Sequence, residues 1–144
     1  MEFARRQRRL RRREEALALI LVRQDTAEVV GGVGLHNIRA PHGRAELGYW
    51  VAVPHWREGY ALEATRAVMD VAFGRLGMHR LEAAVFEGNG PSAALLRKLG
   101  FRREGVMREK FWHWGGWRNE IRFGITVGEY RARKRGSSVR ARRG

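Results

Sequence analysis

The sequence contains no cysteine, only three prolines and no long apolar run among its 144 residues. Without cysteine, the chain cannot build a disulfide scaffold, a thiolate zinc site or a cysteine nucleophile. The apolar stretch ALALILV spans residues 16–22, whereas a helix needs about 20 residues to cross a membrane. Two glutamates precede this stretch, Arg23 closes it, and no small-residue cleavage pattern follows, so we expect no signal peptide. These absences indicate a cytoplasmic protein.

Acidic residues are scarce at both ends, and this scarcity accounts for most of the net charge of +14. Residues 5–13 hold seven arginines, and residues 131–144 hold seven Lys/Arg and no acid. The stretch 16–130 is nearly balanced, with 15 basic and 12 acidic residues. Basic arms of this kind bind nucleic acid, the ribosome or anionic membranes. They equally fit a solvated helix and a tail that keep the protein soluble, and the composition favours neither interpretation.

Strand patterns fill the first half of the chain. Residues 16–23, 28–38 and 45–53 are rich in β-branched and aromatic residues, and short polar turns separate them. This predicts an antiparallel meander. Helical spacing follows Pro54 and continues to Gly77. The predicted apolar face of this helix consists of Ala61, Ala64, Val68, Ala72 and Leu76.

The second half predicts a strand at 79–86, a helix at 91–99 and a hairpin that turns at Gly115 and Gly116. A helix between two strands implies a right-handed crossover with parallel pairing. The order of elements predicts one α+β domain, with a mixed sheet and flanking helices, at residues 16–128. It lies between a basic N-terminal helix at 1–15 and a basic disordered tail at 129–144.

Two short motifs suggest binding chemistry. The first is HWREGYALEA, residues 55–64, which places Arg57 and Gly59 at the start of the predicted helix. Free backbone N–H groups and the helix dipole favour an anion there. The second is GNGPSAALLRKLGF, residues 88–101, in which Asn89 or Ser92 can cap a short helix. Five histidines are scattered without metal-ligand spacing, so we expect no metal site.

Together, in this order, the two motifs resemble the GNAT superfamily of acyl-CoA N-acyltransferases, and most closely the branch that acetylates N-termini of ribosomal proteins. The resemblance runs from about residue 16 to 127. It implies the GNAT fold, with a mostly antiparallel mixed sheet, and acetyl-CoA as co-substrate. Family members usually begin with another strand and two helices that wall the acceptor groove. The chain begins at the last of these, so the resemblance implies an N-terminally truncated domain.

The resemblance also assigns the acetyl-CoA site. The stretch 57–61 matches the family's pyrophosphate loop, and the strand at 49–53 matches the one that lends backbone groups to the pantetheine arm. Asn89 matches a residue that orients the pantetheine, or it simply caps its helix. The implied cofactor-binding residues are Val51, Val53, Arg57, Glu58, Gly59, Tyr60, Ala61 and Asn89.

Two residues are candidates for catalysis. Glu46 matches an acidic position in related N-terminal acetyltransferases and would deprotonate the acceptor amine; alternatively it pairs with Arg44 or another arginine. Ser92 matches a serine proposed to protonate the departing CoA thiolate; alternatively it belongs to the helix cap. Leu96 stands where many members of the superfamily carry a tyrosine acid.

The resulting hypothesis is an acetyl-CoA-dependent N-acetyltransferase whose acceptor is a protein N-terminus, such as that of a ribosomal protein, attacked directly. One alternative is acetylation of a small amine. Another is a degenerate domain that binds RNA or the ribosome through its basic ends. The aromatic residues Phe111, Trp112, Trp114 and Trp117 line the acceptor groove or serve only cross-strand packing.

Overall fold

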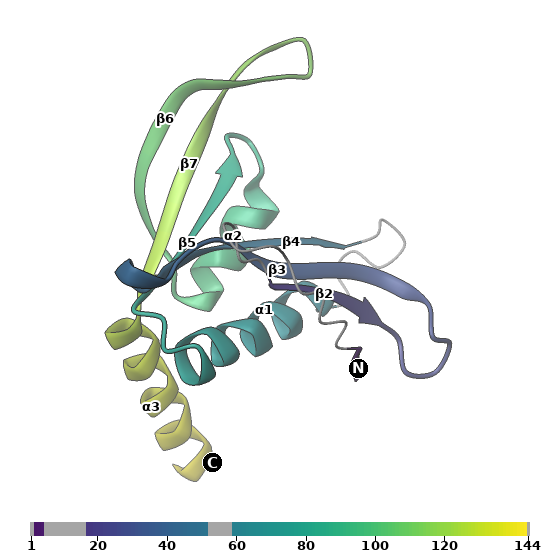
Figure 1. Cartoon of the computed structure of the whole chain (residues 1–144), viewed down its shortest axis with the longest axis vertical. Helices are drawn as coiled ribbons and strands as arrows, with labels where there is room; N and C mark the ends of the chain where they lie inside the picture. The colour runs from purple at the N-terminus through teal and green to yellow at the C-terminus, as the bar shows by residue number, and fades with distance from the viewer. Residues whose placement is uncertain (1, 5–16, 52–58, 144) are drawn as a thin grey trace. The chain divides into compact units, whose positions relative to one another are not determined.

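The structure, a computed structural model, describes residues 2–4, 17–51 and 59–143 (Figure 1). The chain divides into two compact units, Met1–Met78 and His79–Gly144. All strand pairs that the structure describes within the two units are antiparallel. The predicted class, a mostly antiparallel sheet flanked by helices, is confirmed.

The first unit contains four strands that pair in chain order. They are β1 (Glu2–Ala4), β2 (Leu17–Val22), β3 (Val29–Arg39) and β4 (Arg44–Val51), and the short turn η1 (Ala40–His42) joins the last two. Helix α1 (Tyr60–Asp70) contacts β3 and β4 and runs into one π-helical turn, η3 (Val71–Arg75). The core combines buried strand and helix side chains: Leu21, Val33, Leu35, Leu47, Ala64, Val68, Met69 and Ala72.

The π-helical turn explains why one predicted core residue is wrong. The amide of Leu76 donates to the carbonyl of Val71, five residues back, so the turn is wider than in an α-helix. The extra residue rotates the apolar face, and Leu76, predicted to be buried, is 44% exposed. Phe73 and Met78 are buried instead.

The second unit is built on a three-stranded sheet. Strand β7 (Gly116–Thr126) lies between β5 (Arg80–Phe86) and β6 (Arg102–His113). Helix α2 (Gly90–Leu99) contacts β5, and helix α3 (Val127–Arg143) follows β7 (Figure 1). The core of the second unit is formed by Leu81, Leu96, Phe101, Phe123 and Ile125. The predicted parallel pairing across α1 would join the two units and stays a prediction.

The hairpin of β6 and β7 turns one residue earlier than the sequence predicts. His113 pairs with Gly116, so the loop consists of Trp114 and Gly115. Both have positive φ, 50° and 70°, as a two-residue hairpin turn of the I′ type requires. Glycine adopts this geometry easily and tryptophan does not, which is why the Gly-Gly pair was the more obvious turn.

Both ends of the chain differ from expectation. Residues 2–4, expected in a helix, form β1, because the edge of β2 offers backbone groups that an extended segment can bond. Where a disordered tail was expected, α3 forms, and a capping box starts it. Thr126 Oγ1 accepts the amide of Glu129 at 3.3 Å, and Glu129 Oε1 accepts the amide of Thr126 at 3.1 Å. Among the described residues, no helix has the length and apolar character of a membrane span.

We predict that Thr126→Ala destabilises α3 by about 0.5–2 kcal/mol, because the first turn loses its cap. Ser138→Ala, which removes an exposed hydroxyl further along the same helix, should have little effect. Hydrogen exchange of the α3 amides measures both. Equal protection in Thr126→Ala and wild type would show that the cap contributes nothing.

The same cap predicts a pH dependence. The hydrogen bond from the Thr126 amide lowers the pKa of Glu129 below its ordinary value of 4.5. Because its pKa is lower in the folded state, Glu129 stabilises the folded helix at every pH above its ordinary pKa. This stabilisation disappears as the pH falls through the pKa that Glu129 has in the folded state. Glu129→Gln should therefore weaken the exchange protection of α3 at neutral pH and flatten its acid dependence.

Candidate functional site

The start of α1 carries part of the predicted pyrophosphate loop. Gly59 occupies the N-cap position with φ 81° and ψ 4°, and Tyr60 and Ala61 form the first turn. Gly59 has no side chain with which to cap this end of the helix, and no side chain of the described residues forms a cap hydrogen bond there. Amides of a first turn have no partner inside the helix, so this end suits an anionic group. The predicted residues Val53, Arg57 and Glu58 lie outside the described residues.

Val51, the other residue predicted to contact pantetheine, is the last residue of β4. It pairs with Gly31 on β3. Its contact with pantetheine stays a prediction.

Glu46 lies in the middle of a small polar cluster on β3 and β4. It pairs across the strands with His36, and His36 Nε2 lies 3.1 Å from Glu46 Oε2. The side-chain amide of Asn37 donates to the same oxygen at 2.8 Å. The carboxylate is mostly buried, with 20% of its side chain exposed. Glu46 is thus held by a histidine and an amide among the described residues, and its alternative role as the partner of Arg44 or another arginine stays a prediction.

The backbone is adapted to this cluster. Asn37 has φ 47°, in the left-handed region, and the pairing of β3 with β4 shifts its register between His36 and Arg39. Bulges of this kind redirect side chains and are frequent beside functional sites. The ring of His36 lies over Gly48, where a Cβ would come within 3.3 Å of it. Sequence reasoning missed His36 and Asn37; the signal was the pair HN directly before a turn.

At the start of α2, the alternative role of Asn89 as a helix cap is confirmed. Its Oδ1 accepts the amide of Ser92 at 3.2 Å. Ser92 lies in the first turn and is partly buried, and its role as a proton donor stays a prediction. Leu96 is completely buried and serves the core. Glu46 belongs to the first unit and Ser92 to the second, so their joint action is also a prediction.

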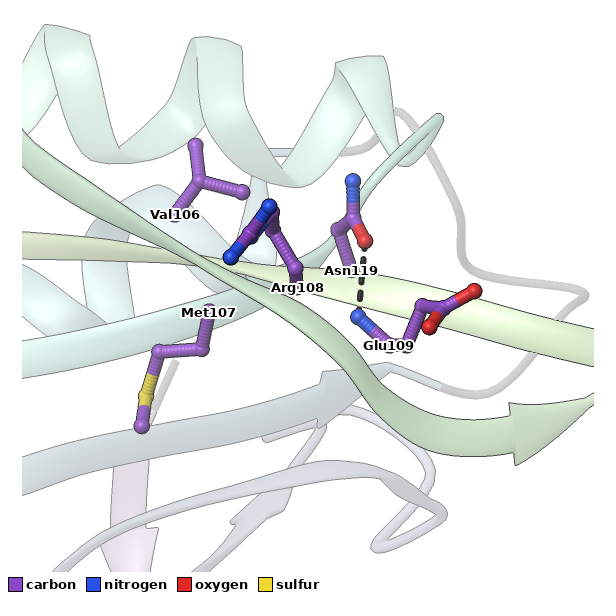
Figure 2. Close-up of a pocket in the computed structure, with 5 residues that line it drawn as sticks. All are labelled: Val106, Met107, Arg108, Glu109 and Asn119. Carbon is purple, nitrogen blue, oxygen red and sulfur yellow. Dashed lines mark hydrogen bonds between the residues drawn. The ribbon is translucent and has the colours of Figure 1, made fainter.

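A hollow on the β6–β7 hairpin was not predicted. Its volume is about 870 Å³, and Val106, Met107, Arg108, Glu109 and Asn119 line it (Figure 2). Asn119 Oδ1 accepts the amide of Glu109 at 2.8 Å and so bridges an irregularity in β6. Figure 2 shows this bond across the two strands, with Met107 pointing to the opposite side from Asn119.

Comparisons with known proteins identify the class. A profile of the acetyltransferase (GNAT) domain matches residues 2–102, more than half of the chain. The chain is 44% identical to the uncharacterised N-acetyltransferase YoaA of Bacillus subtilis over 87 residues, 60% of this chain and 49% of YoaA. It is 33% identical to spermidine N(1)-acetyltransferase of Escherichia coli over 105 residues, 73% of this chain and 56% of that protein. The solved structure of ribosomal-protein-S5-alanine acetyltransferase from Vibrio fischeri has a TM-score of 0.74 and 26% identity, covering 80% of this chain and 63% of that one.

The chain therefore belongs to the GNAT acetyltransferase family. It spans about half the length of the two curated relatives. The matched region includes both sequence motifs, those at 55–64 and 88–101. The matches include uncharacterised N-acetyltransferases as well as spermidine and ribosomal-protein acetyltransferases, so they establish the family and leave the acceptor open.

The geometry of Gly59 yields a prediction. Gly59→Ala should destabilise the first unit by about 1–2 kcal/mol, because a residue with a Cβ is strained in the left-handed region. No atom lies within 4 Å of the added Cβ, so backbone strain is the whole cost. Gly74→Ala is the matched control: its site is equally open but helical, and alanine should be neutral or stabilising there. Urea unfolding measures both, and equal effects would contradict the prediction.

Proposed function

We propose that the chain is an acetyl-CoA-dependent N-acetyltransferase that acetylates a primary amine by direct attack. The observation that carries the proposal is a helix start at a left-handed glycine, which provides no side-chain cap, in a chain of the GNAT family. The first acceptor we propose is a protein N-terminus, such as that of a ribosomal protein.

Acetyl-CoA would bind where β4 leads into α1. The amides of Tyr60 and Ala61 would receive the pyrophosphate, together with Arg57, Glu58 and Gly59. A glycine cap supports this assignment because it places no side-chain oxygen on those amides, which would compete with the phosphate. Val51 and Val53 would bond the pantetheine arm through their backbone groups. Asn89 would orient the same arm in addition to capping α2.

The acceptor must lose a proton before it can attack. The neutral nitrogen attacks the thioester carbonyl, the C–N bond forms, the C–S bond breaks and CoA leaves as a thiolate. Glu46 would take the proton of the ammonium group. The hydrogen bond that Asn37 donates to the carboxylate, and the contact of His36 Nε2 with the same oxygen, fix the carboxylate in place, which supports this role. Ser92 would pass its hydroxyl proton to the departing thiolate and recover a proton from the attacking nitrogen, which must lose a second proton to become a neutral amide.

A small polyamine is the second candidate acceptor. The 33% identity to a spermidine acetyltransferase favours it, as the structural likeness to the S5-alanine acetyltransferase favours a protein N-terminus. The two acceptors differ in basicity, since an α-amine titrates near about 8 and an alkyl amine near about 10.4. The pH dependence of activity therefore separates them.

We predict that Glu46→Gln lowers kcat by about 100-fold or more at pH 7, since general base catalysis contributes roughly that much. The defect should shrink where the acceptor is already neutral, above about pH 8 for a peptide and only above about pH 10 for a polyamine. Steady-state kinetics with a ribosomal-protein N-terminal peptide and with spermidine measure this. Glu109→Gln, an exposed carboxyl on β6, is the control and should keep full activity.

The cofactor site is tested separately. Acetyl-CoA at 100 times its Kd should stabilise the wild-type chain by about 2.7 kcal/mol. The double variant Arg57→Glu with Gly59→Val should lose this stabilisation, because it removes a cation and adds a side chain at the cap. Thermal melts with and without acetyl-CoA measure both. A folded wild-type chain that acetyl-CoA does not stabilise would overturn the proposed function and favour a degenerate domain.

A further inference from the structure

Contacts of Arg133 and Glu129 join three elements of the second unit. The Arg133 side chain lies against Gly100, the residue that ends α2, and its Nη2 donates to the carbonyl of Lys98 at 2.7 Å. At the start of β6, Arg102 Nη1 lies 3.3 Å from Glu129 Oε2. These bonds hold the first turns of α3 against the end of α2 and the start of β6. Cations that the sequence assigned to a disordered tail are thereby fixed on a folded surface.

This surface, which we call the α3 basic face, is strongly positive. All of its cationic residues are exposed: Arg97, Lys98, Arg102, Arg103, Arg131, Arg133, Lys134 and Arg135. Glu129 is the only acid among residues 97–103 and 127–138. The neighbouring Glu104 bonds Arg80, which lowers the pKa of Glu104 and keeps its charge engaged there. Little negative charge therefore offsets the face.

We propose that the α3 basic face binds the phosphate backbone of a nucleic acid. Guanidinium groups match phosphate oxygens in a planar, bidentate geometry, and six of the eight cations are arginines. Lys134 and Arg135 lie three and four positions after Arg131, so each neighbours Arg131 on the surface of α3 at about 5–6 Å between Cβ atoms. A row of closely spaced cations along a helix is the electrostatic footprint of nucleic-acid binding.

The composition of α3 disfavours the main competing partner, an anionic membrane. A helix that lies in a membrane surface needs a broad apolar face with Trp, Phe or Leu. Helix α3 contains none of these three residues, and residues 131–138 are exposed all around. Its attraction to a lipid surface would be electrostatic only.

Within the second unit, the face is separate from the proposed site residues Asn89 and Ser92. It uses the end of α2, whereas Asn89 and Ser92 lie at the start of that helix. Ten helical residues span about 15 Å. Nucleic-acid binding and acetyl transfer can therefore be tested independently.

The test compares two triple variants that remove the same charge. The face variant carries Arg103→Gln, Arg131→Gln and Arg135→Gln. The side chains of these three arginines form no ion pair within the described part of the chain. The first-unit variant carries Arg39→Gln, Arg66→Gln and Arg75→Gln, and so lacks three exposed arginines of the first unit. Both proteins keep the seven arginines of residues 5–13. Fluorescence anisotropy with a labelled RNA hairpin, a DNA duplex and phosphatidylserine vesicles is measured over a series of salt concentrations.

We expect the wild type to bind RNA and DNA with a steep salt dependence. Each lost phosphate contact removes about 0.9 from the slope of log K against log salt, so the face variant should lose roughly two to three units of slope. The first-unit variant should keep the slope. Equal losses in both variants, or no loss in either, would overturn the proposal, as would tighter binding to vesicles than to either nucleic acid. Circular dichroism and thermal melts confirm that both variants are folded.

Discussion

Backbone groups at the ends of a helix have no partner within it, and what meets these groups decides the role of each α-helix here. Helix α2 is closed at both ends, by Asn89 at its start and by Gly100 and Arg133 at its end. Helix α3 starts with a reciprocal threonine–glutamate cap. Helix α1 starts with a bare glycine. Asn89 and Thr126 thus provide side-chain caps for α2 and α3, whereas Gly59 provides none for α1, and the proposed pyrophosphate site lies at that helix start.

The polar cluster around Glu46 shows that polar groups in the sheet also need partners. A carboxylate that is mostly buried must be hydrogen-bonded, and here a neighbouring strand provides both partners. This arrangement requires the backbone of Asn37 to adopt the left-handed conformation, which costs of the order of 1 kcal/mol or more. Strain of this size persists where the surroundings enforce it. The bulge therefore fixes the direction of one side chain at the expense of a regular ladder.

Much of the fold could be predicted from the sequence, because strand and helix periods are strong over long stretches. The limits of β2, β3, β5 and α2 lie within one or two residues of those predicted. The errors share a cause: features that depend on a single hydrogen bond or residue. The π-helical turn moved Leu76 outward, Trp114 took a conformation that favours glycine, and the cap at Thr126 ordered a polar segment. The cap at Thr126 could have been predicted from the sequence, because T-x-x-E is a known signal for the start of a helix.

The candidate site divides in a similar way. Motif residues could be placed in advance because their spacing relative to helix starts is local. The partners of Glu46 could not, since they depend on the register of two strands and on a bulge between them. The α3 basic face depended on the packing of three elements distant in sequence, joined by Arg133.

The hairpin tip has an optical consequence. Three of the five tryptophans of the chain lie there, and each is more than half exposed. Trp112 and Trp117 face each other across the strands edge to face, with ring centroids 5.3 Å apart. Two indoles so close together couple their electronic transitions. The tip should therefore carry its own signature in circular dichroism, distinct from the helical signal, so that its folding can be followed without a label.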